Sequence, residues 1–296
     1  MKKTFLGAIA MAVLMGLTAC EKPVIEDNPT PVEQDELVDV RFHITHFDQI
    51  PFENAANLSR AGSNVGEACT RINLAVFSDD TKVKSVNQMS TDDNFGTLDV
   101  ALQPGTYTVV ILAHSGQGNA TISSPEEVKF ANNKVTDTFY YTETINVSDT
   151  ENRSIVLQRA VAMFQLCTED NIPDNVHELI FKYTGGSSTF NAKEGFGSVN
   201  SRQTETREVT AEMKGKPGVF DVYTFPHAET GELKITVTAT DADGNEILER
   251  VFEAVPVKMN QITRYTGEFF TGTAPSENGS FSLTVENQWT EADYKF

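Results

Sequence analysis

The stretch LDVALQPGTYTVVILA, residues 98–113, shows the pattern on which the fold depends. Leu98, Val100 and Leu102 alternate with other side chains, which is the period-two pattern of a strand with one buried face. Pro104-Gly105 predicts a turn, after which the chain returns as a strand from Tyr107 to Ala113. The returning strand is apolar at successive positions, as expected for a central strand that is covered on both faces.

Similar strand signals continue on both sides of this hairpin. In a first block they cover residues 38–44, 72–76, 139–147 and 154–157, and in a second block residues 160–166, 180–183, 219–225, 233–239, 247–255, 262–270 and 281–285. Residues 48–68 and 184–205 are glycine-bearing and lack periodicity, so they are predicted loops. Short strands separated by turn residues favour an all-β fold built from sandwiches, and we expect one sandwich in residues 37–157 and another in residues 158–296.

The N-terminal segment has the features of an export signal. Lys2 and Lys3 precede an apolar run that ends at Leu17, and this run is shorter than the roughly 20 residues that cross a bilayer. The run closes with Leu17-Thr18-Ala19-Cys20, which resembles the lipobox of bacterial lipoproteins. The resemblance implies that residues 1–19 are removed and that Cys20 becomes the acylated first residue. The alternative is an ordinary signal in which the cysteine occurs by chance.

Residues 20–36 predict a tether. They contain three prolines and six acidic residues without apolar periodicity, so they cannot bury a core. Removing residues 1–19 takes away two lysines and no acid, which leaves 21 basic against 42 acidic residues and a formal charge of −21. Coulomb repulsion therefore opposes binding to nucleic acid or anionic lipid, and attachment to a membrane has to come from the acyl chains.

No motif in the chain points to catalysis, a cofactor or a metal. The sequence lacks GxSxG, HExxH and a phosphate-binding glycine loop. Asp241-Ala242-Asp243-Gly244 begins like a calcium loop, but its glycine comes too early, and Asp-Gly between two alternating runs favours a two-residue hairpin turn. Cys69 and Cys167 could form a disulfide in an exported protein, or each could be a small buried side chain.

Aromatic residues leave two interpretations open. Tyr140, Tyr141, Phe269 and Phe270 are either core residues of a sandwich or part of a platform on which sugar rings stack. The second interpretation predicts two or more exposed aromatic rings on one shallow surface.

Several separated pieces of the chain resemble the FimB-type fimbrial anchor and fimbrillin family of lipoproteins. Besides the lipobox and the tether, the pieces are TRINLAVF (70–77), QPGTY (103–107), LQRAVA (157–162), YTGG (183–186), VPVKMN (255–260) and GEFF (267–270), and together they span most of residues 37–290. The resemblance implies two tandem transthyretin-like β-sandwiches. It also implies a role in type V surface pili that are exported as lipoproteins and assembled by exchange of β-strands with other subunits.

Within that family, polymerising subunits lose their first strand to an arginine-specific protease, whereas anchor subunits keep both strand and lipid. Here the first predicted strand, Val38 to Ile44, lies between Cys20 and Arg60, a candidate processing site in a predicted loop. We favour the uncut form, a non-enzymatic anchor or accessory subunit on the outer membrane that pairs with pilin. The alternatives are a shaft subunit cut after Arg60, a surface glycan-binding lipoprotein, and a hydrolase. No constellation of catalytic residues in the sequence supports the hydrolase.

Overall fold

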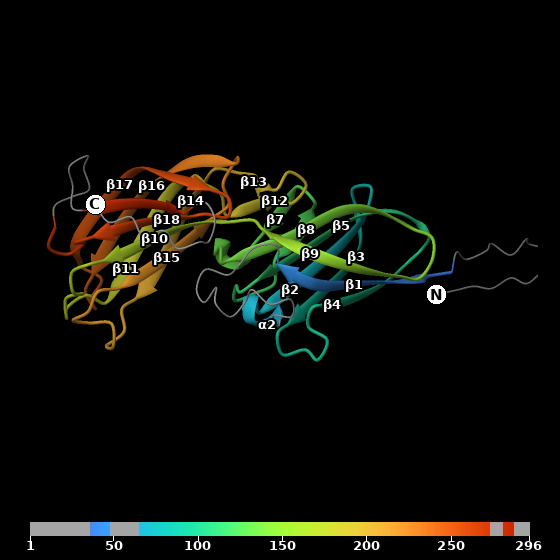
Figure 1. Cartoon of the computed structure of the whole chain (residues 1–296), viewed down its shortest axis with the longest axis horizontal. Helices are drawn as coiled ribbons and strands as arrows, with labels where there is room; N and C mark the ends of the chain where they lie inside the picture. The colour runs from blue at the N-terminus through green and yellow to red at the C-terminus, as the bar shows by residue number, and fades with distance from the viewer. Residues whose placement is uncertain (1–35, 48–64, 273–280, 287–296) are drawn as a thin grey trace, which may run out of the picture. The chain divides into compact units, whose positions relative to one another are not determined.

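The regular elements of the described residues are almost all β-strands, which confirms the predicted all-β class (Figure 1). The computed structural model describes residues 36–47 and 65–272 and the backbone of residues 281–286. Within these ranges the helical elements are the single turns α2 (Val65–Ala68) and η1 (Ala131–Asn133).

The first half of the chain forms one seven-stranded sheet in the order β3-β2-β5-β8-β9-β1-β4. The only pairs that join β8 to β9 are Phe139 with Arg159 and Tyr140 with Gln158. The sheet therefore folds over at this point into two layers that enclose one hydrophobic core. The strands are β1 (Val38–Phe47), β2 (Arg71–Ser78), β3 (Thr81–Met89), β4 (Thr97–Leu102), β5 (Gly105–His114), β8 (Thr138–Val147) and β9 (Glu151–Arg159).

The second half forms two four-stranded sheets that enclose a second core containing Phe164, Phe181 and Phe252. One sheet has the order β15-β10-β18-β19 and the other the order β14-β11-β16-β17. The strands are β10 (Ala162–Thr168), β11 (Glu178–Gly186), β14 (Ser201–Glu208), β15 (Val219–Thr224), β16 (Thr230–Thr240), β17 (Glu246–Lys258), β18 (Ile262–Gly267) and β19 (Phe281–Glu286).

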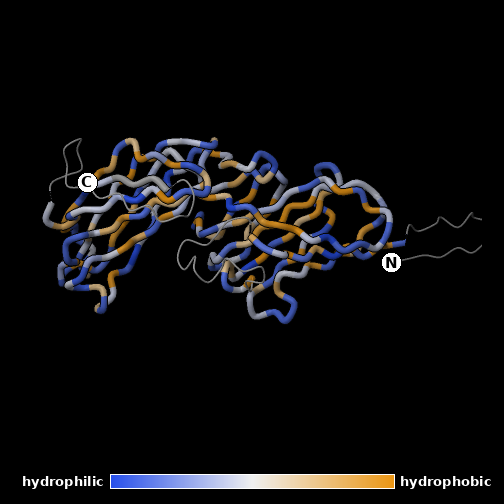
Figure 2. The backbone as a smooth tube through the Cα atoms, in the orientation of Figure 1, coloured by the Kyte–Doolittle hydropathy of each residue, from blue (hydrophilic) through white to orange (hydrophobic). Residues whose placement is uncertain are grey.

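Apolar and polar residues alternate along many of these strands, and Figure 2 colours the backbone by this hydropathy. In β1 the buried side chains are Val40, Phe42 and Ile44, with exposed residues between them. β5 is buried at every position from Val109 to His114, as expected for a strand covered on both faces. Its second face carries Val110 and Leu112, which belong to a third hydrophobic cluster.

That third cluster lies against a small sheet to which both halves of the chain contribute. β6 (Thr121–Ser124) and β7 (Glu127–Lys129) come from the first half, β12 (Thr189–Asn191) and β13 (Phe196–Gly197) from the second, and β7 pairs with β12. The prediction of a loop over residues 184–205 is therefore wrong. These strands are too short to show periodicity, and the pairing partner of β12 lies in the other half of the chain.

A buried arginine reinforces the same junction. Arg159 Nε and Nη2 donate to the two carboxylate oxygens of Asp137 at 2.8 and 2.9 Å, and Nη1 donates to Asn260 Oδ1 at 3.1 Å. Its side chain is fully buried and lies 4.8 Å from the centre of the Phe139 ring. The division of the chain at residues 157 and 158 stays a prediction, since residues 35–296 form one compact unit with a shared cluster.

Candidate functional site

The first strand occupies a slot between two strands that come from later in the chain. β1 pairs antiparallel with β4, where Phe42 faces Leu98, and parallel with β9, where Phe42 faces Arg153. We call the position between β4 and β9, which β1 fills, the β1 slot. Because both long edges of β1 are paired, its removal would leave β4 and β9 with unpaired backbone groups that face each other.

Burial adds to this pairing. Val40, Phe42 and Ile44 have 0%, 0% and 2% of their surface exposed, and each buried side chain of this size stabilises the fold by roughly 1.5–3 kcal/mol. On the outer face Arg41 forms an ion pair with Asp99 of β4 at 2.6 Å, which is half exposed and therefore contributes little. The hydrophobic face, more than the charges, therefore holds β1 in the slot.

The two site residues predicted from the sequence, Cys20 and Arg60, both lie outside the described residues. The chain reaches β1 through residue 36 and leaves it at residue 47, and the next described residue is Val65. Their predicted roles, acylation and proteolytic processing, stay predictions. What the structure adds is that the strand between them in sequence, β1, is a fully paired member of the first sheet.

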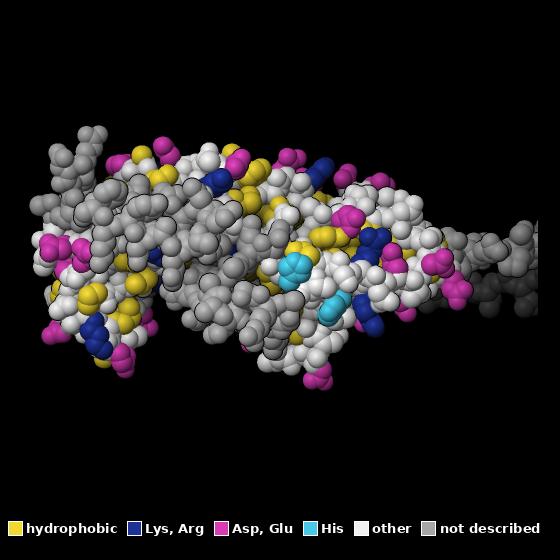
Figure 3. Space-filling view, viewed as in Figure 1, with side chains coloured by type: hydrophobic (Ala, Val, Ile, Leu, Met, Phe, Trp, Pro, Cys, Tyr) yellow, Lys and Arg dark blue, Asp and Glu magenta, His cyan; other side chains and the backbone are white. Residues whose placement is uncertain are grey.

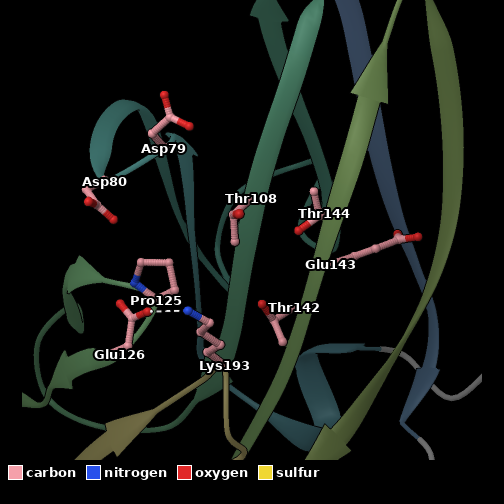
Figure 4. A pocket seen from close by; sticks show the side chains of 9 residues that line it. All are labelled: Asp79, Asp80, Thr108, Pro125, Glu126, Thr142, Glu143, Thr144 and Lys193. Atoms are coloured by element: carbon pink, nitrogen blue, oxygen red, sulfur yellow. Dashed lines mark hydrogen bonds and ion pairs between the residues drawn. The ribbon is translucent and has the colours of Figure 1, made fainter.

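A polar cavity of about 520 Å³ lies on the outer face of β5 and β8 (Figure 4). Its lining residues are Asp79, Asp80, Thr108, Pro125, Glu126, Thr142, Glu143, Thr144 and Lys193. Lys193 pairs with Glu126 at 2.9 Å, and this hydrogen bond lowers the pKa of the Glu126 carboxyl. The lining contains no cysteine that could act as a nucleophile and no histidine that could act as a base for the threonine hydroxyls of the lining.

Aromatic rings form no exposed platform in the part of the chain that the structure describes. The exposed large hydrophobic residues there are all aliphatic or methionine: Leu37, Val83, Met89, Val199, Val219 and Ile247. Tyr140 stacks edge to face on Phe190, and Phe270 does so on Phe269. Phe269 is buried, and Tyr140, Tyr141 and Phe270 are half-buried against the hydrophobic clusters, which leaves the sugar-stacking interpretation without support there.

The Asp241 segment is a hairpin connection between β16 and β17, as predicted, although it is longer than a two-residue turn. Asp241 Oδ1 accepts the backbone N–H groups of Asp243 and Asn245 at 3.0 and 2.8 Å, and Gly244 has φ +81°. The carboxylate thus closes the turn itself. Within the described ranges, no group of three or more acidic, histidine or cysteine side chains is placed to hold a metal ion.

Both cysteines of the described region are free thiols. Cys69 is buried in the first core, and burial raises the pKa of its thiol to about 12, while Cys167 is half-buried on β10. The interpretation of a Cys69–Cys167 disulfide is therefore not supported.

Among the described residues no helix is long and apolar enough to cross a membrane. Figure 3 shows acidic side chains scattered over the viewed face.

Comparison with known proteins identifies a family but no activity. Residues 33–295 match the model of DUF6562, a family of unknown function. No curated protein matches the chain.

Several solved bacterial structures have a similar course of the chain. A candidate adhesin from Bacteroides ovatus has 14% identity and a TM-score of 0.48, covering 81% of this chain and 88% of its own. A candidate polysaccharide-binding protein from Bacteroides thetaiotaomicron has 11% identity and a TM-score of 0.49, covering 86% and 99%. The fimbrial anchor protein Mfa2 from Porphyromonas gingivalis has 10% identity and a TM-score of 0.41, covering 86% and 98%. At these values the similarity carries no argument about function.

Proposed function

We propose that this chain, a member of the DUF6562 family, is a non-enzymatic outer-membrane lipoprotein that acts as an anchor or accessory subunit of surface fimbriae. The observation that supports this proposal is the β1 slot. The strand that follows the predicted lipid-bearing Cys20 is paired on both sides and buried through Val40, Phe42 and Ile44. A lipid on Cys20 would thus be joined to the first sandwich through a strand that is paired along both of its edges.

The pairing of β1 on both edges suits a subunit that carries mechanical load. A force applied to the lipid end enters β1 at Val38 and runs along the strand, so the hydrogen bonds to β4 and β9 resist it together. The short tether of residues 20–36 adds reach without adding a core of its own. An intact chain thereby couples a membrane anchor to a folded body, which is what the base of a fibre requires.

A shaft subunit cut after Arg60 is the competing arrangement. Such a cut would disconnect β1 and the lipid from the rest of the chain, and loss of β1 would open the slot to a neighbour's strand. In that case the mature protein would begin after Arg60. The two arrangements therefore differ in the N-terminus of the protein recovered from fibres.

The Cys20→Ser variant tests the proposed function in the native bacterium. We expect assembled fibres to move from the cells into the medium, because the subunit that holds them has lost its acyl chains. Cys167→Ser, which changes a half-buried thiol on β10, is the matched control and should leave the fibres on the cells. Fibres that stay on the cells in Cys20→Ser would refute the anchor role.

A further inference from the structure

We infer that the outer edge of β4 is the surface at which this protein pairs with an extended strand of a partner subunit. The inference rests on the proposed function, in which the intact chain fills its own β1 slot. A partner strand then needs another edge, and β4 is the outermost strand of the sheet that contains the β1 slot.

The pairing of β4 with β1 fixes which of its backbone groups point outward. Ile44 N–H donates to Gly96 O at 2.9 Å. In an antiparallel pair, hydrogen-bonded and non-hydrogen-bonded residue pairs alternate. From the register of β1 and β4, the backbone groups of Leu98 and Val100 therefore point toward β1, whereas those of Asp99 and Ala101 point away from it.

The outward groups of Asp99 and Ala101 have no hydrogen-bond partner among the described residues. At the start of the strand Thr97 is occupied, because its N–H donates to Asn94 O at 2.9 Å and its carbonyl accepts Gln88 Nε2 at 2.7 Å. No side chain or backbone group in the described ranges caps the N–H or C=O of Asp99 or Ala101. Residues Thr97–Leu102 also contain no proline, lysine or bulge, the devices that commonly protect an edge.

The outer edge of β15 shows the contrast. Thr168 N–H donates to Gly218 O, so by the same alternation Val219, Asp221 and Tyr223 are the outward residues of β15. The carbonyls of Asp221 and Tyr223 are both capped. Arg207 Nε and Nη2 donate to Asp221 O at 2.9 and 2.7 Å, and Tyr183 Oη donates to Tyr223 O at 2.9 Å.

Other edges are protected in different ways. On β14 the carbonyls of Thr204 and Thr206 accept Lys134 Nζ and Arg207 Nη1. β17 contains Pro256 and a positive φ at Ala254, both of which interrupt pairing. β3 has a register shift beside Lys82 and carries Lys84, so charge and irregularity discourage an added strand.

The surroundings of the β4 edge indicate the chemistry of the partner strand. A cavity of about 330 Å³ on the outer face is lined by Asp39, Arg41, Asp99, Thr150, Glu151 and Asn152, three carboxylates against one guanidinium. The chain as a whole carries a formal charge of −19. A strand with apolar residues on its inner face and Lys or Arg opposite Asp99 therefore fits this edge, and an acidic strand is repelled.

Amide hydrogen exchange of the purified mature chain tests the inference directly. The probe is a capped nine-residue peptide that alternates valine with lysine, and its control alternates valine with glutamate. We expect the valine–lysine peptide to slow exchange of the Asp99 and Ala101 amides by at least tenfold, while Leu98 and Val100 are protected with or without it. Protection that appears only at other edges, or at none, would overturn the inference.

The Ala101→Pro variant removes one outward N–H and no hydrogen bond to β1, because the Ala101 N–H points away from β1. Proline is tolerated at such strand edges. Ala101→Val keeps the N–H and is its matched control. Peptide protection should disappear in Ala101→Pro and persist in Ala101→Val, with thermal unfolding showing that both variants fold. Equal protection in the two variants would contradict pairing through this edge.

The Cys20→Ser and Ala101→Pro variants, each made in the native bacterium, separate the two proposals. Release of fibres by both Cys20→Ser and Ala101→Pro supports both. If Cys20→Ser releases fibres and Ala101→Pro does not, the β4 edge is the wrong surface and the anchor role stands. If Cys20→Ser releases nothing, the anchor role fails, and the peptide experiment still decides whether β4 accepts a strand.

Discussion

His114 is the buried residue that most directly links stability to pH. It has none of its surface exposed. Its Nδ1 accepts the Gly116 N–H at 3.0 Å, so its Nε2 carries the proton and donates to Asn73 Oδ1 at 2.9 Å. Burial, followed by repulsion from Arg71, lowers the pKa of His114 to about 4.

This pKa predicts that acid weakens the fold. The unfolded chain, with a pKa of about 6.5, binds the proton more readily than the folded one, so stability is present above pH 6.5 and is lost between pH 6.5 and pH 4. The loss is about 3 kcal/mol over the whole window. Urea unfolding at pH 7 and pH 4.5 measures it. In His114→Gln the fall between the two pH values should shrink by most of that amount; an unchanged fall would contradict the assignment.

At the scale of single residues, the sequence predicts turns between neighbouring residues better than contacts between residues that are far apart in the chain. The turn at Asp243-Gly244 follows from two adjacent residues. The histidine network does not, because Asn73 lies 41 residues from His114 and nothing in the local pattern links them. Arg159 likewise contacts Asp137, 22 residues away, and Asn260, 101 residues away, and neither contact shows in the local pattern.

Among the elements, the segment that enters the small shared sheet depends on glycine. A Cβ atom at Gly197 would lie 2.5 Å from Ser187 Cβ and 2.7 Å from Phe225 O. Gly197→Ala should therefore destabilise the protein by about 1–3 kcal/mol, the usual cost of overpacking. At Gly231 a Cβ meets Val257 at 3.7 Å, so Gly231→Ala is the matched control and should change the free energy of unfolding by less than about 0.5 kcal/mol. Equal denaturant midpoints for the two variants would contradict this packing.

Strands with one buried face were predictable from alternation, as β1 and β4 illustrate, and β5 was predictable from its continuous apolar run. β7, β12 and β13 were not, because two or three residues cannot display a period. The bulge between Ile44 and His46 was also hidden from the pattern. It puts both His43 and His46 on exposed positions.

On the scale of the whole molecule, the two halves share a hydrophobic cluster. Val110 and Leu112 from β5 belong to the same cluster as Phe190 and Phe225 from the second half. We therefore expect a single calorimetric transition, with a calorimetric enthalpy close to the van't Hoff value. Two resolved transitions would show that the halves fold independently.

The central claim is that the mature protein keeps both its lipid and β1. The most direct measurement is the intact mass and N-terminal sequence of the protein recovered from outer membranes of the native bacterium. We predict an acylated chain that begins at Cys20 and includes residues 38–47. A chain that begins after Arg60, or one that carries no acyl group, would contradict the claim.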